Sequence, residues 1–288
     1  MQRFAVLTAA IFQAAAVWAQ APSGPAPFAF AVIGDTGTGG RGQYEVGKRL
    51  LDVRKSIPFQ SVLMLGDNIY GSQGPKDLRT KFELPYSGLI DDGVKFYAVL
   101  GNHDSTGQRS YPLFNMGGRS YYTFRPHPDV QFFGIDSNRV DDAQLAWIEK
   151  ELARSGCAWK IVFFHHPLYS SGARHGSSIA LRAALEPLFV KYGVAVALAG
   201  HDHFYERIKP QQGVQYFVVG GSSKLRSGVR AVGLTEKVYT SDYSFVVMEI
   251  ENGTLRYRAL NRAGQTIDEG AVRRPERPAP IALTPLPE

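Results

Sequence analysis

Residues 61–70 read SVLMLGDNIY, where an apolar run at Ser61–Leu65 is followed directly by the polar motif Gly66-Asp67-Asn68-Ile69-Tyr70. Four other apolar runs of the chain end in the same way. Each of them is followed by a short motif rich in Asp, Asn or His: Gly34-Asp35-Thr36-Gly37 after Phe28–Ile33, Gly101-Asn102-His103-Asp104 after Val94–Leu100, His165-His166-Pro167 after Trp159–Phe164, and Gly200-His201-Asp202-His203 after Val194–Ala199. Short apolar runs bounded by such residues are typical of buried strands.

Helical patterns alternate with these strands, at residues 43–56, Asp141–Ser155 and Ser178–Tyr192. Further strands are expected at residues 121–124, 130–135, 214–220, 243–250 and 254–260. Alternating strands and helices predict an α/β fold with sheet strands that are buried on both faces. The short connections near the C-terminus leave α+β as the alternative, with two packed sheets. Ligands bind at the carboxyl ends of such strands, so we expect the five motifs to converge on one site.

The two ends of the chain differ from this globular middle. Arg3, the apolar run at residues 4–17 and the small residues after it predict a secretory signal peptide at 1–19, cleaved there or as late as residue 21. An uncleaved membrane anchor is the alternative. We expect a linker at 20–27, one domain at 28–272 and a Pro-rich tail at 273–288. The mature protein is then secreted or periplasmic and free of the membrane.

The chain of 288 residues carries a formal net charge of +6 and one cysteine, Cys157, for which we expect a buried packing role. A mild basic excess favours anionic partners. The densest basic groups are Lys224/Arg226/Arg230 and Arg273/Arg274/Arg277, which we interpret as solvated surface. No basic and aromatic motif predicts nucleic-acid binding. We expect a monomer whose partner is a small molecule.

Eight polar side chains at the strand ends are candidates for binding metal or substrate. They are Asp35, Asp67, Tyr70, Asn102, His103, His165, His201 and His203. Carboxylate, imidazole and phenolate groups suit iron, zinc or manganese. Eight groups exceed what one tetrahedral zinc needs, so the count predicts two metal ions.

Together the blocks GD-T-G, GD-NI-Y, GNHD, V-FF-H and GH-D-H resemble the signature of purple acid phosphatases, which belong to the calcineurin-like metallophosphoesterase superfamily. The similarity runs from about residue 28 to about residue 270 and is strongest to the small, tartrate-resistant type. The resemblance implies mixed β-sheets packed as a sandwich, flanked by helices, with the metal site at strand carboxyl ends. The wider superfamily has a histidine where this chain has Gly37, and lacks the tyrosine at Tyr70. A histidine ligand is thus exchanged for a phenolate.

The resemblance also implies a role for each candidate. Fe(III) would be held by Asp35, Asp67, Tyr70 and His203. A divalent ion, Fe, Zn or Mn, would be held by Asp67 as a bridge together with Asn102, His165 and His201. His103 would stabilise charge on phosphate, and His175 would protonate the leaving group.

The expected activity is that of an acid phosphatase that hydrolyses phosphate monoesters by attack of a metal-bound hydroxide. Two alternatives remain: a phosphodiesterase or nucleotide-cleaving enzyme on the same scaffold, and a binding protein without activity. Outside the ligand set, we expect Asp104 and Asp202 to orient neighbouring groups and Glu206 to pair with Arg207. His127 and His166 are interpreted as ordinary residues, with His166 a candidate for lining the pocket.

Overall fold

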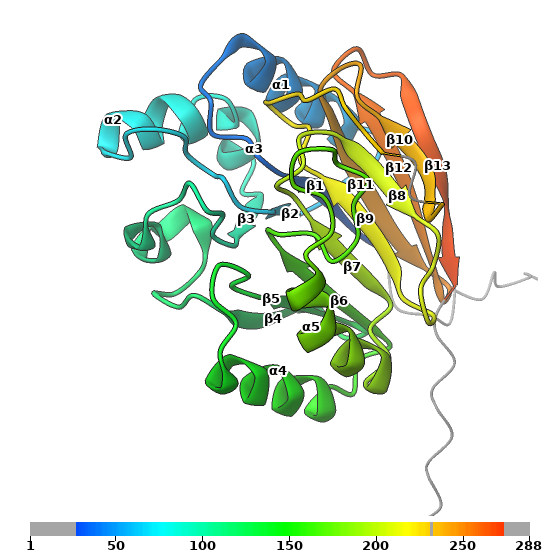
Figure 1. Cartoon of the computed structure of the whole chain (residues 1–288). Coiled ribbons are helices and arrows are strands. Elements are labelled where there is room, and N and C mark those ends of the chain that lie inside the picture. The colour runs from blue at the N-terminus through cyan, green and yellow to red at the C-terminus, as the bar shows by residue number, and fades with distance from the viewer. Residues whose placement is uncertain (1–26, 231–232, 274–288) are drawn as a thin grey trace, which may run out of the picture.

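A computed structural model describes residues 27–230 and 233–273 and contains two mixed β-sheets that face each other (Figure 1). The strands are β1 (Phe28–Ile33), β2 (Ser61–Met64), β3 (Lys95–Ala98), β4 (Tyr122–His127), β5 (Val130–Gly134), β6 (Trp159–Phe164), β7 (Val196–Ala199), β8 (Tyr205–Ile208), β9 (Gln215–Val219), β10 (Thr235–Tyr239), β11 (Ser244–Glu251), β12 (Thr254–Asn261) and β13 (Thr266–Arg273). The α/β class and the two packed sheets expected from the sequence are confirmed.

The first sheet has the order β13-β12-β11-β1-β2-β3. Strands β1, β2 and β3 are parallel, whereas β11 to β13 form an antiparallel extension on the other side of β1. The register aligns the last residue of each parallel strand, because Met64 pairs with both Ile33 and Ala98. The polar motifs that follow these three strands therefore begin side by side at one edge.

The second sheet has the order β10-β8-β9-β7-β6-β5-β4. Strands β5, β6, β7 and β9 are parallel, and β4, β8 and β10 are antiparallel additions at the two sides. Phe164 at the end of β6 pairs with Ala199 at the end of β7. The motifs after β6 and β7 are thus also neighbours.

Side chains of β6 alternate between the two hydrophobic cores, as strand geometry requires. Ile161 and Phe163 face the core between the sheets, while Val162 and Phe164 face the core beneath the helices. The first core also receives Phe30 from β1, which lies edge-on to Phe132 of β5. Apolar contacts therefore hold the two sheets together and fix the positions of the strand ends.

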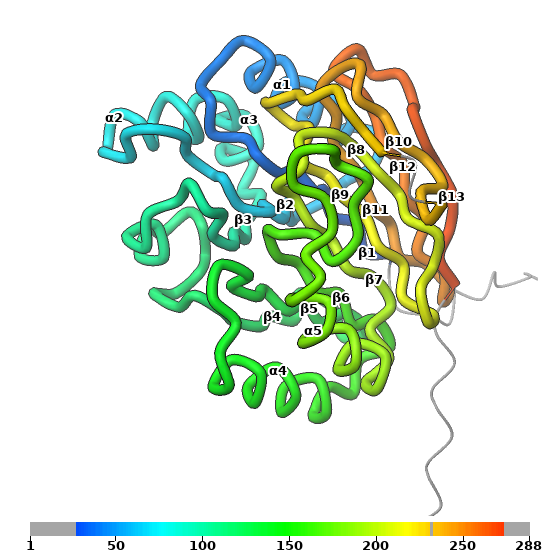
Figure 2. Tube along the Cα trace, in the orientation of Figure 1, coloured from blue at the N-terminus to red at the C-terminus, as the bar shows by residue number. Residues whose placement is uncertain are grey.

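Helices and helical turns lie outside the two sheets and cover part of the outer face of each (Figure 2). They are α1 (Arg41–Arg54), α2 (Pro75–Leu78), the π-helical turn η1 (Arg79–Glu83), α3 (Ser87–Asp91), the 3-10 turns η2 (Thr106–Ser110) and η3 (Pro112–Phe114), α4 (Asp142–Arg154) and α5 (Ile179–Lys191). Helix α4 buries Ile148 and Leu152 against the second sheet, beside Phe189 of α5. Its first turn is capped by Asp141, whose side chain accepts a hydrogen bond from the backbone of Gln144.

Several elements differ from the expectations of the sequence. Strands β8, β10 and β13 and the helical segment from α2 to α3 were not predicted, and β13 ends at Arg273, one residue beyond the expected domain boundary. The proposed signal peptide, almost all of the linker and the tail from residue 274 lie outside the described residues. Cys157 is buried, as expected. None of the helices in the described part of the chain is long and apolar enough to span a membrane.

Candidate metal centre

Three of the predicted ligands have an unusual backbone conformation at the point where a strand ends. Asp35, Asp67 and His201 have φ angles of 55, 51 and 69°. Positive φ is uncommon for non-glycine residues and is concentrated at functional sites, where the surrounding structure fixes it. Each of these residues lies within three residues of a strand end: Asp35 follows β1, Asp67 follows β2 and His201 follows β7.

Close approach of the backbone accompanies these turns. A side chain on Gly101 would place its Cβ atom 2.2 Å from Oδ1 of Asp67, so the loop after β3 can lie against this carboxylate only with glycine there. The backbone N–H of His103 then donates a hydrogen bond of 3.0 Å to the same oxygen. The end of β3 is thereby fixed to the side chain at the end of β2.

One group of side chains surrounds Asp35 in the loop after β1. Its Oδ1 atom accepts a hydrogen bond of 3.0 Å from the Tyr70 hydroxyl and lies 3.3 Å from Nε2 of His203. The Tyr70 hydroxyl is 3.4 Å from the same Nε2 atom. Asp35, Asp67 and His203 are buried and bring ligand atoms within 4.8 Å of one another.

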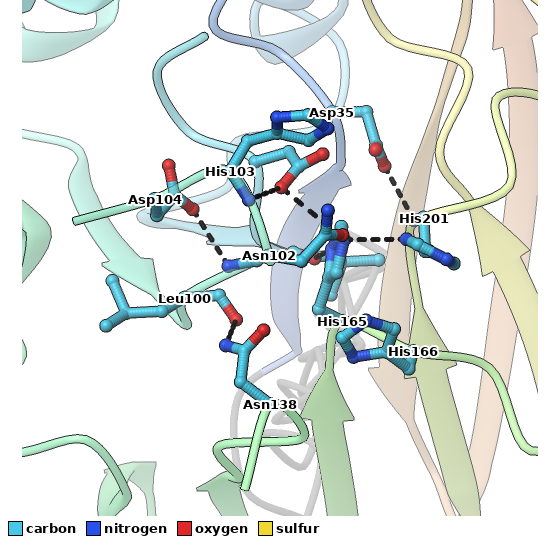
Figure 3. Close-up of polar contacts among 12 residues, drawn as sticks. Asp35, Leu100, Asn102, His103, Asp104, Asn138, His165, His166 and His201 are labelled. Atoms are coloured by element: carbon cyan, nitrogen blue, oxygen red, sulfur yellow. Dashed lines mark hydrogen bonds and ion pairs between the residues drawn. The ribbon is translucent and has the colours of Figure 1, made fainter. Parts of the chain in front are cut away.

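A second group surrounds His165 at the end of β6 (Figure 3). Its Nδ1 atom is 2.8 Å from the carbonyl oxygen of Leu65, and its Nε2 atom is 3.0 Å from both Oδ1 of Asn102 and Nδ1 of His201. Oδ1 of Asp67 lies 3.5 Å from the same Nε2 atom. Asp67 therefore belongs to both groups, in the position of a bridge.

The donor chemistry of both groups fits metal binding. The Leu65 carbonyl can only accept, so Nδ1 of His165 carries the proton and Nε2 presents a lone pair to Asn102 and Asp67. Burial lowers the pKa of His165 well below its usual range and that of His201 to about 2, so protons on the imidazoles do not offset these acceptors. Burial and the charge of Asp67 also raise the pKa of Asp35. Cations held by these nitrogen and oxygen atoms would remove the repulsion between the facing lone pairs and carboxylates.

His103 and His175 lie at the rim of the two groups, and both are exposed. The ring of His103 is 5.0 Å from the ring of Tyr70, on the side of the first group. The ring of His175 is 4.1 Å from that of His201, on the side of the second. The two histidines that the resemblance links to substrate thus border the centre from opposite loops.

Two carboxylates hold the surrounding loops in place by accepting backbone hydrogen bonds. Asp104 accepts from the N–H groups of Asn68, Ile69 and Gly101, which ties the loop after β2 to the loop after β3. Asp202 accepts from the Ser170 hydroxyl at 2.5 Å and from the Gly176 N–H at 3.1 Å. Orienting roles were expected for both residues, and these contacts agree with that expectation.

The expected ion pair between Glu206 and Arg207 does not form. These residues are adjacent on β8, so their side chains point to opposite faces of the sheet. Glu206 accepts from the N–H of Ser171, and Arg207 pairs instead with Asp268 at 2.8 Å. Both contacts support the structure around the centre without belonging to it.

Three residues next to the centre were not assigned to it from the sequence: His166, Lys224 and Arg226. His166 has its ring 4.5 Å from that of His201 and joins His165 and His201 in a group that could hold a metal ion. Lys224 lies over the Tyr70 ring, with Nζ 3.7 Å from the ring centroid. The charges of Arg226 and Lys224 both contribute, after burial, to the lowered pKa of His203. The solvated-surface interpretation is therefore wrong for Lys224 and Arg226, although nothing in the motifs themselves signalled this.

Comparisons with known proteins agree with the fold and the site. The model of the family described as Calcineurin-like phosphoesterase matches residues 28–205. The tartrate-resistant acid phosphatase type 5 of rabbit (Oryctolagus cuniculus) is 26% identical over 236 residues, which cover 67% of this chain and 72% of that protein.

Solved structures show the same fold at lower identity. A purple acid phosphatase from yellow lupin seeds superposes with a TM-score of 0.73 and 20% identity over 88% of this chain and 55% of that one. GAP50 of Plasmodium, described as the anchor in the inner membrane complex, gives a TM-score of 0.74 and 21% identity over 87% of this chain and 90% of that one. Because one of these proteins is a phosphatase and the other is described as an anchor, the fold alone does not define the function.

Proposed function

The chain belongs to the calcineurin-like phosphoesterase family, and we propose that it is a secreted binuclear-metal acid phosphatase that hydrolyses phosphate monoesters. One observation carries the proposal. Asp67 lies between two groups of metal-binding side chains, one with Asp35, Tyr70 and His203 and the other with Asn102, His165 and His201. A scaffold kept only for binding other proteins has no use for so many metal-binding side chains gathered at one place, four of which (Asp35, Asp67, His165 and His203) are buried.

Tyr70 gives this centre its proposed metal preference. Its hydroxyl lies within 3.4 Å of both Asp35 and His203, where it can bind the same cation as they do. Phenolate is a hard, anionic donor, which favours trivalent iron at this position. The group of His165 offers the neutral amide of Asn102 in addition to imidazoles, which suits a divalent ion, Fe, Zn or Mn.

Two bound cations supply a water molecule of lowered pKa and neutralise charge on the phosphoryl group. The protein contributes the remaining parts. His103 borders the first group and is placed to donate a hydrogen bond to a phosphate oxygen, in the manner of an oxyanion-stabilising side chain. His175 borders the second group on an exposed loop and is placed to give a proton to the departing alkoxide. The hydrogen bonds of Asp104 and Asp202 hold the loops that carry these histidines.

The decisive experiment combines metal analysis, colour and substrate choice. We expect purified protein, expressed from Gln20, to contain two metal ions per chain and to show a broad visible charge-transfer band that Tyr70→Phe abolishes. It should hydrolyse phenyl phosphate much faster than diphenyl phosphate.

Each negative result removes a different part of the proposal. Active but colourless protein would remove Fe(III)–tyrosinate and leave the phosphoesterase. A preference for the diester would favour the phosphodiesterase alternative. Metal-loaded protein that hydrolyses neither compound would favour the binding protein. Export of the full-length chain, followed by N-terminal sequencing of the mature protein, tests secretion and the cleavage site together.

A further inference from the structure

The segment from Gly221 to Arg230, after β9, is fixed to the backbone of the metal centre. Ser222 donates its N–H to the carbonyl of Gly34 at 3.3 Å, and the Ser223 hydroxyl donates to the carbonyl of Asp35 at 2.8 Å. The N–H of Arg226 donates to the carbonyl of His203 at 3.0 Å. Two of the residues placed around the first metal position therefore hold this segment through their own carbonyl groups.

Two cationic side chains project from this fixed segment toward the centre. Lys224 is half-buried and its ammonium group lies 3.7 Å from the centroid of the Tyr70 ring. Arg226 is also half-buried, and its Nη1 atom is buried without a hydrogen-bond partner among the described residues. No carboxylate of the described chain forms an ion pair with either residue, although ion pairs are found for many other Lys and Arg side chains.

Unlike Arg226, Arg207 on β8 has carboxylate partners. Its guanidinium group is paired with Asp268 at 2.8 Å and with Glu236 at 3.1 Å, which satisfies it in the usual way. Leaving a buried guanidinium nitrogen unpaired costs free energy, so such a group in a native protein calls for a partner such as a water molecule, an ion or a ligand. Arg226 therefore has a donor without an acceptor among the described residues, and it is close enough to His203 for its charge to act on that imidazole.

We propose that Lys224 and Arg226 form an anion subsite that binds a second negatively charged group of the substrate, next to the phosphoryl group held at the metal centre. The inference rests on the proposed function for the position of the scissile phosphate. The shared chemistry of the second group is a carboxylate or a further phosphate, both of which fit the fork of a guanidinium. The preferred substrates are then phosphate monoesters whose leaving group is itself anionic.

Three aryl phosphates of matched shape test this selection. They are 3-carbamoylphenyl phosphate, which has a neutral substituent, 3-carboxyphenyl phosphate and 1,3-phenylene bisphosphate. In the wild-type protein we expect kcat/KM for the two charged substrates to exceed that for the carbamoyl compound by about ten- to a hundredfold, the range of a charge-assisted hydrogen-bond pair. Whichever charged compound shows the larger ratio identifies the source of the second anion.

Substitution then assigns the preference to these residues. Arg226→Gln should reduce the ratio of kcat/KM for the charged and neutral substrates about tenfold or more, and Arg226→Lys should reduce this ratio less. The double variant Lys224→Gln/Arg226→Gln should have a lower ratio than Arg226→Gln alone. Lys237→Gln, which removes one positive charge from an exposed position on β10, is the matched control and should leave the ratio unchanged. A ratio near one in the wild-type protein, or an equal ratio in Arg226→Gln and wild type, overturns the proposal.

Binding of non-hydrolysable analogues separates this inference from the proposed function. Calorimetry with the corresponding 3-carboxyphenyl and 3-carbamoylphenyl phosphonates measures the same ratio without turnover. If no phosphate ester is hydrolysed but the carboxylated phosphonate binds more tightly in an Arg226-dependent manner, the phosphatase proposal fails and the anion subsite stands. If the esters are hydrolysed and the two phosphonates bind equally, the subsite fails and the phosphatase stands.

Discussion

Nε2 of His165 lies 3.0 Å from Oδ1 of Asn102, and both atoms are acceptors because Nδ1 of His165 is the atom that carries the proton. Two acceptors at this distance repel each other unless a cation lies between them. The buried carboxylates of Asp35 and Asp67 also repel each other, and burial together with the charge of Asp67 raises the pKa of Asp35. The folded chain therefore contains repulsion that metal binding relieves.

The first prediction concerns removal of the metal. Stripping the protein with a chelator should lower its melting temperature by several degrees, and adding back metal should restore it. A metal held at a free concentration about a thousandfold above its Kd stabilises the fold by about 4 kcal/mol. Differential scanning fluorimetry with parallel elemental analysis measures both quantities. If the metal content falls to zero and the melting temperature does not change, metal binding does not relieve the repulsion and the prediction is wrong.

The second prediction is that the substitution Asp67→Asn stabilises the metal-free protein. Asp67→Asn keeps an oxygen for the His103 N–H but removes one of the two buried carboxylates. The metal-free variant should be more stable than metal-free wild type by on the order of 1 kcal/mol, as is common when a strained functional site is relaxed. The same variant should gain little from added metal. Urea unfolding of both proteins, with and without metal, gives the four free energies of unfolding.

The third prediction distinguishes His166 from its neighbour. The Ser137 hydroxyl oxygen accepts from the N–H groups of both His165 and His166, so its own proton is directed at Nδ1 of His166. We therefore expect Nε2 of His166 to carry a proton and to act as a hydrogen-bond donor, although His166 belongs to a group that could hold a metal ion. His166→Gln should retain both metal ions and lower kcat/KM about tenfold, whereas His165→Gln should lose metal. Loss of a metal ion from His166→Gln would instead make His166 a ligand.

The fourth prediction concerns the loop that carries His175. Asp202 holds this loop through Ser170 and Gly176, so Asp202→Asn should loosen it without removing a ligand. If His175 protonates the leaving group, both His175→Gln and Asp202→Asn should slow poor alkyl leaving groups about tenfold or more while affecting good aryl leaving groups far less. Kinetics across a series of leaving groups measures this dependence. Equal losses for all leaving groups would point to a general structural effect.

The strands with the longest apolar runs could be predicted from the sequence, because a strand that is buried on both faces consists of consecutive apolar residues. The prediction failed for β8 and β10, which are short and contain charged residues such as Glu206 and Lys237. These strands exist because β9 offers an open side to β8, and β8 in turn to β10. Such pairing depends on residues that are distant in the chain.

The same reason explains which parts of the site could be foreseen. Asp35 and Asp67 follow the neighbouring parallel strands β1 and β2, and His165 and His201 follow the neighbouring parallel strands β6 and β7, so strand order brings the members of each pair together. The contact between the two pairs depends on how the two sheets face each other. Lys224 and Arg226 lie in an irregular segment whose position is set by contacts with Gly34 and with the carbonyl of His203. Local sequence carries no sign of those contacts, and the basic residues read as ordinary surface.

The last prediction concerns Gly37, the position at which the resemblance to the wider superfamily implies a histidine. A Cβ atom at this position would lie 2.2 Å from the carbonyl oxygen of Asn68 and from Cα of Ile69. The two segments are further joined by hydrogen bonds from the Gly37 N–H to the Asp67 carbonyl and from the Tyr70 N–H to the Gly37 carbonyl. The loop that carries Tyr70 thus lies where a side chain at residue 37 would have to be. If Tyr70 is the ligand that we propose, a side chain at residue 37 and the present position of the Tyr70 loop exclude each other.

Gly37→Ala should consequently displace Asp67 and Tyr70, lower the free energy of unfolding by about 1–3 kcal/mol and weaken the visible band. Gly37→His combined with Tyr70→Phe should not rebuild a metal site, because the backbone still occupies the space. Gly40→Ala is the matched control: its Cβ atom would meet only the Thr38 side chain at 3.5 Å, so stability and colour should persist. Urea unfolding, iron content and the visible spectrum of these variants test the coupling. A Gly37→Ala protein with wild-type colour and stability would show that the loop that carries Tyr70 can move aside without cost. The proposed dependence of Tyr70 on Gly37 would then be wrong.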